Sequence, residues 1–287
     1  MTIKDALTTL PQYILPHHSL SRIMGKLTHS QNKYWKHFFI SQIVKHYGVN
    51  MAEATEPNIK RYLHFNDFFT RTLNPAQRPI DQQANGIVSP ADGEVSQCGP
   101  IVVDQLIQAK GKAFSVKDLV GGQQKVAEQF YGGQFATIYL SPKDYHRLHM
   151  PITGHLIEMI HIPGRLFSVN AATTRAVPNL FARNERVVAI FSTEAGPMAL
   201  ILVGAIFVAS IETVWHGVVT PPTHNAIQSW RYVDREVSLE KGKEMGRFNM
   251  GSTIIVLFGK DMTRWIQDLK EGHALKLGQL IGEIKTS

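Results

Sequence analysis

The change in residue pattern near position 87 constrains the fold more than any other feature of this chain. From Ile87 onward, short runs rich in β-branched residues alternate with Gly and Pro, as in FATIYL, IEMIHIPG, VVAIF and STIIVLF. Runs of this length, bounded by turn residues, predict strands. Residues 87–287 are therefore expected to form a mostly antiparallel β structure with a few short helices.

Residues 1–80 have a different pattern, which predicts helices. The stretch from Asn32 to Tyr47 carries Trp35, Phe39 and Ile43 at a spacing of four, and Gly48 is suited to cap its C-terminus. The apolar stripe has two interpretations. It packs on the protein's own core, or it lies in the headgroup region of a lipid surface, which suits a basic helix rich in aromatic residues.

The rest of the N-terminal region leads into a linker. Asn66 to Leu73 predicts a second short element, and the polar stretch from Pro75 to Gly86 predicts the linker. The expected fold class is therefore α+β, with an N-terminal helical region packed on a mostly antiparallel β-sheet core. The expected boundaries are 1–80 for the helical region and 87–287 for the core.

The positive charge of the chain is concentrated in this N-terminal region. Residues 1–80 hold 10 Lys and Arg against 4 Asp and Glu, whereas the whole chain has a formal net charge of +7. Such a segment indicates an anionic partner, either nucleic acid or an acidic lipid surface; a solvated basic face without a partner is the alternative. Cys98 is the single cysteine, so no disulfide within the chain is possible and a reducing compartment is expected.

No segment is expected to cross a membrane. The first ten residues lack a charged start followed by an apolar run, so no secretory signal is expected. The longest nearly uncharged run, Ala199 to Ile211, is well short of the roughly 20 residues that a spanning helix needs. Its Val and Ile content predicts a buried strand instead.

Two short segments each place a reactive residue type beside a glycine. Asp92 lies in the turn SPADG, where an Asp bonded to its own backbone is the common alternative. Ser252 follows Gly251 at the entry of an apolar strand, where a glycine at a bulge is the alternative. Neither segment indicates a function by itself.

A third segment carries two histidines. Ser141 and Pro142 suit the start of a helix, which predicts one short helix with His146 and His149 on the same side. They could be surface residues, metal ligands or participants in a reaction. No metal site is expected, because further ligands with suitable placement are missing.

Taken together, the three segments supply the parts of an acid–base–nucleophile triad: an Asp in a turn, a His and a Ser after Gly. No Gly-x-Ser-x-Gly elbow is present, which disfavours an ordinary α/β-hydrolase. A phosphate-binding Walker loop and a His-Glu-x-x-His helix are absent as well.

Five strings, in this order, resemble the bacterial, pyruvoyl-dependent phosphatidylserine decarboxylase proenzymes of the prokaryotic type I family. They are SPADG around Asp92, YHRLHMP around His146 and His149, PNLFARNERV from Pro178, GPMALILVGA from Gly196, and MGRFNMGST around Gly251 and Ser252. The similarity spans essentially the whole chain. One departure is Met250, where the family often has Leu; the two are close in volume, so little effect is expected.

The resemblance implies a set of site residues. Asp92, His149 and Ser252 would form a self-processing triad, and His146 would be the candidate proton donor in decarboxylation. Cleavage between Gly251 and Ser252 would leave a β chain of residues 1–251 and an α chain of residues 252–287. Ser252 would become a covalent pyruvoyl group, the only cofactor expected.

The implied chemistry needs these residue types. Ser252 must attack the carbonyl of Gly251, and its neutral hydroxyl needs a base, which His149 would supply while Asp92 holds its tautomer. Gly251 would allow a strained turn at the bond. The pyruvoyl carbonyl would then capture the substrate amine and accept the charge left by CO2.

The resemblance also implies partners and a location. Phosphatidylserine is the expected substrate, in phospholipid biosynthesis, and the basic helical region would hold the enzyme as a peripheral protein on the anionic, cytoplasmic face of the cell membrane. A homodimer is expected, and nucleic acid is not. The loop from Gly164 to Val169 is expected over the pocket, with Phe167 as a lid that contacts substrate.

Three other classes of protein remain as alternatives. One is a serine hydrolase that uses the same three residues on external substrates. Another is a non-catalytic protein that binds membranes or nucleic acid. The nearest is a decarboxylase of a water-soluble amino acid, which the basic, aromatic N-terminal region disfavours.

Overall fold

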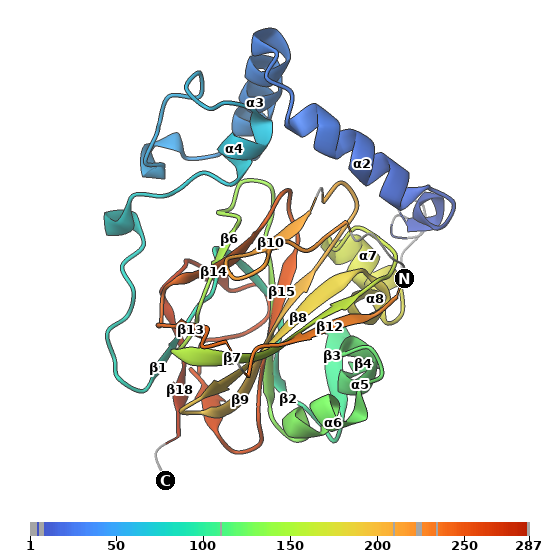
Figure 1. The fold of residues 1–287 in the computed structure, drawn as a ribbon, viewed down its shortest axis with the longest axis vertical. Coiled ribbons are helices and arrows are strands. Elements are labelled where there is room, and N and C mark those ends of the chain that lie inside the picture. Colours follow the sequence, from blue (N-terminus) through green and yellow to red (C-terminus); the bar gives the residue numbers. More distant parts are fainter. Residues whose placement is uncertain are drawn as a thin grey trace.

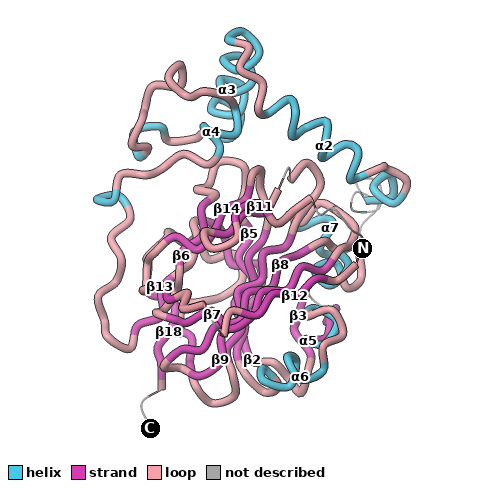
Figure 2. Tube along the Cα trace, viewed as in Figure 1, coloured by secondary structure: helices cyan, strands magenta, loops and turns pink. Residues whose placement is uncertain are grey.

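A computed structural model describes residues 5, 9–109, 111–208, 210–221, 226–233 and 235–285 of the chain. Helices lie at one end of the molecule and in small groups beside the sheets (Figures 1 and 2). The α-helices are α2 (His17–Thr28), α3 (Lys33–Tyr47), α4 (Phe65–Phe69), α5 (Val116–Leu119), α6 (Gln124–Ala127), α7 (Ala171–Ala176) and α8 (Leu180–Arg183). Short 3-10 turns are η1 (Leu10–Tyr13), η2 (Met51–Glu53), η3 (Pro75–Gln77) and η4 (Glu128–Phe130).

The large central sheet has the strand order β12-β7-β8-β9-β15-β5-β2-β17, and β13 pairs with β7. Its strands are β2 (Gly93–Pro100), β5 (Gln134–Tyr139), β7 (Gly154–Ile162), β8 (Arg186–Thr193), β9 (Gly196–Val203), β12 (Gln228–Arg231), β13 (Ser238–Leu239), β15 (Thr253–Phe258) and β17 (Ala274–Leu275). The pairings between these strands are antiparallel. The fold is therefore α+β with antiparallel sheets, as the sequence predicts.

Smaller sheets complete the β structure, with strand orders β1-β18-β16, β11-β10-β14-β6 and β3-β4. Their strands are β1 (Gly86–Val88), β3 (Gln105–Ala109), β4 (Lys112–Ser115), β6 (Arg147–His149), β10 (Ile211–Thr213), β11 (Gly217–Val218), β14 (Glu244–Phe248), β16 (Thr263–Trp265) and β18 (Leu280–Ile284). The sheets β1-β18-β16 and β11-β10-β14-β6 pack on one side of the central sheet, whereas β3-β4 and the helices α5–α8 lie on the other side (Figure 1).

Both faces of the central sheet are buried, which explains why its middle strands are apolar throughout. In β15, Ile254, Val256 and Phe258 belong to one hydrophobic core, whereas Ile255 and Leu257 belong to the other. Because alternate side chains of a strand point to opposite faces, a strand covered on both sides needs an unbroken apolar run. Strand β15 lies between β9 and β5, deep in the sheet.

The helix α3 begins and ends where the sequence predicts. Asn32 caps its N-terminus by accepting hydrogen bonds from the backbone N–H groups of Tyr34 and Trp35, and Gly48 ends it in the left-handed conformation. Its apolar stripe faces inward: Phe39 packs on Phe65 of α4, with ring centroids 4.4 Å apart. Part of the stripe therefore packs on the protein's own core, with Trp35, Phe39 and Ile43 half-buried, and its contact with lipid stays a prediction.

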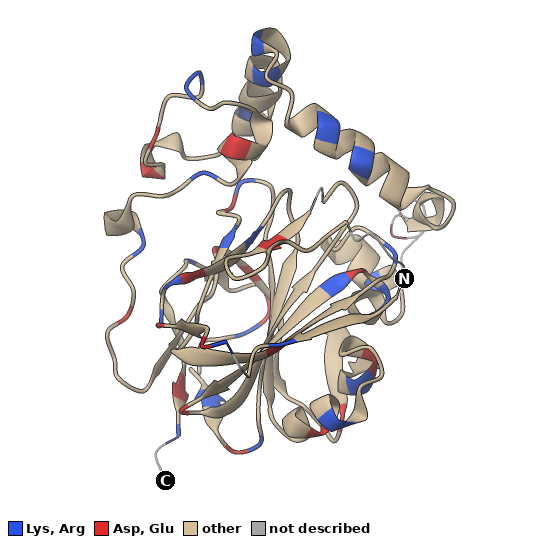
Figure 3. Cartoon of the chain, viewed as in Figure 1, with Lys and Arg blue, Asp and Glu red and all other residues tan. Residues whose placement is uncertain are grey.

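The outward faces of the N-terminal helices are nevertheless apolar. On α3, Tyr34 and Phe38 are 88% and 57% exposed. On α2 the usual arrangement is inverted, because the polar residues His17, Ser21 and Thr28 are buried while Ile23 and Leu27 are exposed. Figure 3 shows Lys and Arg residues along the same two helices. Among the described helices, none is long and apolar enough to cross a membrane.

The short helix expected after Ser141 is not formed. The carboxylate of Asp144 accepts hydrogen bonds from both the backbone N–H and the hydroxyl of Ser141 at 2.7 Å, which closes a turn. The chain then becomes β6 and pairs with β14, where His149 lies opposite Glu244. The expected placement of His146 and His149 on one helix face is therefore wrong.

The apolar run from Ala199 to Ile211 forms a strand only in its first part. Strand β9 ends at Val203, and the chain turns at Gly204, whose N–H donates to the carbonyl of Glu185 at 2.8 Å. A Cβ on Gly204 would lie 3.1 Å from that same oxygen, so the close approach needs glycine. Ile211 belongs to the next strand, β10.

Candidate active site

Ser252 lies immediately before β15, in the middle of the molecule. Its carbonyl accepts a hydrogen bond from the backbone N–H of Leu140 at 2.8 Å, which continues the ladder between β15 and β5. The side chain is fully buried, and its Oγ has no hydrogen-bond partner among the residues that the structure describes. An unpaired buried hydroxyl costs stability, so it marks a position that packing alone does not explain.

The residues before Ser252 are strained and closely packed. Met250 has a φ of +103°, a conformation that a residue with a side chain rarely adopts. The expected strain therefore lies at Met250 rather than at Gly251, which is not among the residues with positive φ. A Cβ on Gly251 would lie 3.3 Å from Nε2 of His146 and 3.6 Å from the carbonyl oxygen of Leu140. Glycine thus lets the backbone approach the histidine.

His146 is fully buried and points its free nitrogen at this bond. Its Nδ1 donates to the carbonyl of Asp144 at 2.8 Å, which leaves the proton on Nδ1 and a lone pair on Nε2. Within the described part of the chain, that Nε2 has no hydrogen-bond partner. Burial, together with the positive charge of Arg71, lowers the pKa of His146 to about 3, so the ring is neutral at ordinary pH.

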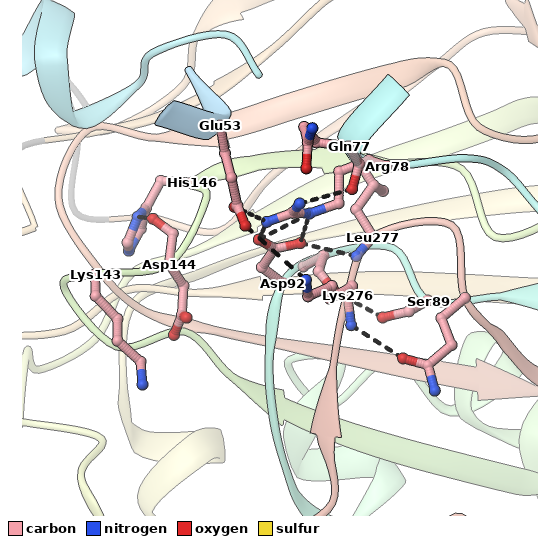
Figure 4. A network of polar contacts seen from close by, with 12 residues as sticks. Glu53, Gln77, Arg78, Ser89, Asp92, Lys143, Asp144, His146, Lys276 and Leu277 are labelled. Carbon is pink, nitrogen blue, oxygen red and sulfur yellow. Dashed lines mark hydrogen bonds and ion pairs between the residues drawn. The ribbon is translucent and has the colours of Figure 1, made fainter. Parts of the chain in front are cut away.

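Asp92 is held by an arginine that the sequence did not single out. Arg78 donates from Nε and Nη2 to the Asp92 carboxylate, at distances of 2.6–3.1 Å, and the backbone N–H of Leu277 donates to it at 2.8 Å. Arg78 also pairs with Glu53 at 2.6 Å (Figure 4). Its two carboxylate partners raise the pKa of Arg78 and keep it charged, despite the opposing effect of burial.

His149 uses both of its ring nitrogens. Its Nδ1 donates to the carbonyl of Gly242 at 2.8 Å, and its Nε2 accepts from the hydroxyl of Tyr145 at 3.1 Å. Burial lowers the pKa of His149, which favours the neutral ring. Burial also raises the pKa of Tyr145 to about 12, so its phenol remains a proton donor. The carbonyl of Gly242 thus fixes the tautomer of His149, a role that the sequence analysis gave to Asp92.

The structure brings some of the predicted site residues together, but among the described residues Asp92, His149 and Ser252 are not joined as a bonded triad. His146 and Ser252 adjoin the Gly251–Ser252 bond, whereas no hydrogen bond joins Asp92 to His149 among the described residues. The segments that carry Asp92 and His149 are nevertheless adjacent, since the backbone N–H of His149 donates to the carbonyl of Pro90 at 2.8 Å.

Comparison with known proteins gives two family models that match the chain. The model described as phosphatidylserine decarboxylase matches residues 65–283, and one described only as PSD matches residues 7–48. The chain belongs to the phosphatidylserine decarboxylase family. The first of these matches contains every residue of the predicted site.

Curated relatives in this family match over almost the full length. Proteins named phosphatidylserine decarboxylase proenzyme from Pseudomonas putida (strain GB-1) and Saccharophagus degradans are both 52% identical to the chain over 284 residues. The alignments cover 98% and 99% of this chain and 99% of each relative. A protein of the same name from Pseudomonas fluorescens is 51% identical.

Phe167 lies within the core rather than on an open surface. Its ring is fully buried against Tyr13 and His17, with centroids 5.0 and 5.2 Å away. The guanidinium groups of Arg165 and Arg183 lie over its faces at 5.6 and 5.4 Å. The lid role expected of Phe167 in this family member stays a prediction.

A polar cavity of about 610 Å³ lies beside the site. Asp92 and Asp144 line it. Tyr139 and Ser141 line it as well, and they flank Leu140, whose backbone N–H donates to the carbonyl of Ser252. Among the described residues, no group of three His, Cys, Asp or Glu side chains is placed to share a metal ion.

Three residues important to this geometry were missed by the sequence reasoning. Tyr145 and His149 lie in the same motif, YHRLHMP, which carries the family resemblance, so the sequence could have indicated that the two side chains are close. Phe69, whose ring centroid lies 4.0 Å from that of His146, is in the phenylalanine-rich segment that shares the resemblance, whereas Arg78 gave no such signal. Each is far in sequence from the residue it contacts, and only the fold brings them together.

Proposed function

We propose that this chain is a phosphatidylserine decarboxylase that cleaves its own Gly251–Ser252 bond and then converts phosphatidylserine to phosphatidylethanolamine and CO2. One observation carries the proposal: the unpaired Oγ of Ser252 and the unpaired Nε2 of His146 are both buried at that bond. Leaving two such groups without partners is costly, which indicates chemistry at this position. The names of the relatives supply the substrate.

Cleavage begins with attack of Ser252 Oγ on the carbonyl carbon of Gly251. A histidine takes the hydroxyl proton, the peptide C–N bond breaks, and the nitrogen of Ser252 gains a proton, so an ester links the two residues. Loss of the Cα hydrogen of Ser252 then expels Gly251 as a carboxylate. Water converts the resulting C=C unit to a ketone with loss of ammonia. The strained backbone of Met250 adjoins the bonds that change.

We assign the first proton transfer to His149, with Asp92 as the supporting charge, as the family motif implies. The supporting observation is the tautomer: Nδ1–H is held by Gly242, which leaves Nε2 as the acceptor. For this role His149 must exchange the hydroxyl of Tyr145 for that of Ser252. The ion pair between Arg78 and Asp92 holds the carboxylate in place during the exchange.

We assign the proton transfers of decarboxylation to His146. A pyruvoyl group on residue 252 would supply a carbonyl that accepts the electron pair left by CO2. The Nδ1 proton of His146 is held by the carbonyl of Asp144 and its Nε2 is unpaired among the described residues, so Nε2 is the atom placed to take a proton from the substrate ammonium group once cleavage has opened the site. As an imidazolium, His146 then returns a proton to the substrate Cα. Gly251 now fills the space beside Nε2 of His146, and its departure after cleavage leaves that space open to the substrate.

The N-terminal helices dock the enzyme on an anionic bilayer. The supporting feature is the outward face of α2, where Ile23 and Leu27 are exposed next to Arg22 and Lys26. Exposed apolar residues beside basic ones suit the headgroup region, where each Lys or Arg contributes about 1 kcal/mol. A peripheral position at the cytoplasmic face of the cell membrane and a homodimer belong to the same proposal and rest on the family resemblance.

The decisive test is the state of residue 252 in active protein. Wild type is expected to separate into two chains on a denaturing gel, and mass spectrometry of the fragment 252–287 is expected to find a ketone at its first residue. Ser252→Ala is expected to stay whole at 32.2 kDa. An unprocessed, fully active wild type would end the proposal.

A serine hydrolase acting on external substrates is the second candidate. The unpaired Oγ of Ser252 favours it, because a serine hydrolase also needs a serine hydroxyl that is free to attack its substrate. Its full burial disfavours it, because an external substrate has no access to that hydroxyl. A fluorophosphonate probe should label a hydrolase and leave this chain unlabelled.

A further inference from the structure

Arg71 is a buried cation without an acidic partner. It follows α4, is 5% exposed, and lies over the ring of Phe68 at 5.3 Å. Its Nη2 donates to the carbonyl of Lys143 at 3.0 Å, but its Nε and Nη1 have no hydrogen-bond partner among the described residues. Burying a guanidinium with two unused donors is expensive and calls for a physical explanation.

The carboxylates near Arg71 are already engaged by other groups. Asp92 and Glu53 both pair with Arg78. Asp144 accepts from the backbone and hydroxyl of Ser141. Among the described residues, neighbouring acids therefore leave Nε and Nη1 of Arg71 unoccupied. Both nitrogens are shielded from solvent, so an anion in the adjoining cavity forms charge-assisted hydrogen bonds with them only after the side chain shifts toward it.

The position of Arg71 places such an anion in the cavity beside the candidate site. Arg71 lines the 610 Å³ cavity together with Lys143 and Lys276. Two residues earlier, Phe69 lies 3.9 Å from the position that a Cβ on Gly251 would occupy. Arg71 also lies close enough to His146 for its charge to lower the pKa of that ring. The guanidinium thus lines the cavity and lies near the imidazole that adjoins the cleavage bond, although Gly251 and Ser252 do not themselves line that cavity.

The substrate of the proposed function, on which this inference rests, carries two anionic groups. Its carboxylate leaves as neutral CO2, so a cation held on that group would stabilise the substrate more than the transition state and oppose the reaction. Its phosphodiester keeps its charge from start to finish. We propose that Arg71, with Lys143 at the rim of the cavity, binds the phosphodiester of the phosphatidylserine headgroup.

The experiment uses the processed enzyme and short-chain lipids, so that membrane docking does not contribute. Monomeric dihexanoylphosphatidylserine is the substrate. Dihexanoylphosphatidylglycerol is the inhibitor, because it keeps the phosphodiester and lacks both the amine and the carboxylate. The variants are Arg71→Gln, Arg71→Lys and the control Arg264→Gln, whose side chain is 70% exposed and pairs with Glu283.

Arg71→Gln is expected to raise both the KM for the substrate and the inhibition constant of the phosphatidylglycerol by at least about tenfold, the loss typical of hydrogen bonds to a charged group. Arg71→Lys should fall between Arg71→Gln and wild type, and Arg264→Gln should match wild type. A raised KM with unchanged inhibition would place the carboxylate, not the phosphodiester, at Arg71 and overturn the proposal. Two unchanged constants would overturn it as well.

Measurements on wild type protect the test against a variant that fails to fold. Phosphatidylglycerol must inhibit competitively, whereas dihexanoylglycerol, which has the same acyl chains and no phosphate, must not. Equal inhibition by the two, or by inorganic phosphate at the same concentration, would contradict a lipid phosphodiester site. Wild type that releases no CO2 would instead contradict the proposed function, so the two failures are distinguishable.

Discussion

The phenyl ring of Phe69 lies over the imidazole of His146, with 4.0 Å between the ring centroids. The contact joins the N-terminal helical region to the core, because Phe69 ends α4 whereas His146 precedes β6. It also removes one face of the imidazole from water. Desolvation is the largest cause of the low pKa of His146.

The low pKa of His146 predicts that acid weakens the fold. Above the ordinary pKa of 6.5 the ring is neutral in both states, so it contributes no pH dependence. Between 6.5 and about 3, the unfolded chain binds a proton that the folded chain does not, so the free energy of unfolding falls as the pH falls. This group adds up to about 1.4 kcal/mol per pH unit to that slope.

His146→Gln should therefore lose stability less steeply than its parent between about pH 6 and pH 4.5. Urea denaturation measures the slope, and a Ser252→Ala background keeps the chain uncleaved. His37→Gln is the matched control, because His37 is exposed on α3. Equal slopes for the parent and His146→Gln would show that this buried ring does not govern the acid sensitivity.

The two histidines should separate cleavage from decarboxylation. His149→Ala is expected to remain a single chain, because Ser252 loses its proposed base. His146→Ala is expected to cleave but to lose decarboxylation by about 10²–10⁴-fold, the usual contribution of a general acid–base. A denaturing gel reports the first step and CO2 release the second. The reverse pattern, with His146→Ala uncut, would exchange the two assignments.

Removing Arg78 should destabilise the chain strongly. Within the described residues, Asp92 would be left without its cation, and Glu53 would keep only the longer pair with Lys276 at 3.9 Å. Breaking a buried pair in this way costs about 3–5 kcal/mol. Urea denaturation of Arg78→Leu in the Ser252→Ala background measures the loss. Arg264→Leu, which breaks an exposed pair with Glu283, should cost less than about 1 kcal/mol. Similar losses for the two variants would contradict the role given to Arg78.

The outward face of α2 should control binding to vesicles. Ile23→Asp with Leu27→Asp places two charges on exposed apolar positions and should weaken cosedimentation with anionic vesicles while the fold stays intact. Val102→Asp, a change at a residue 64% exposed in the loop before β3, is the control and should bind as wild type does. Equal binding by all three proteins would remove α2 from the docking surface.

Lysine substitutions on α3 need care, because one lysine of the expected basic face is structural. Lys36 is buried and donates to the backbone carbonyls of Lys60 and Tyr62 at 3.1 and 2.5 Å. Its charge reversal would disturb the fold of the N-terminal region. Lys33 and Lys45 are exposed and can be reversed without that effect.

Local signals explain what the sequence predicted correctly. The helix α3 carries its own caps, Asn32 and Gly48. The strand β15 is apolar on both faces and follows a glycine, which made its start and the Gly251–Ser252 position visible. In both cases the residues that decide the structure lie next to one another in the chain.

Contacts over long sequence distances explain the errors. Ser141 and Pro142 have the residue types of a helix start, but pairing of β6 with β14 overrides that preference. Asp92 is fixed by Arg78 and Leu277, and nothing in the turn SPADG indicates either partner. The stripe of α3 is equally apolar whether it faces α4 or lipid, so periodicity alone left that choice open.

The location of Ser252 at the head of β15 determines what a backbone break there would do to the architecture. The segment after the break contributes an interior strand, hydrogen-bonded along its whole length to β5 and β9, and further strands to the sheets containing β2 and β1. Strands of the fragment are hydrogen-bonded within the central sheet and within the β1-β18-β16 sheet, so the fragment cannot diffuse away while these sheets remain folded. Once such a nicked molecule unravels, its two pieces must find each other again in solution, so refolding becomes dependent on concentration.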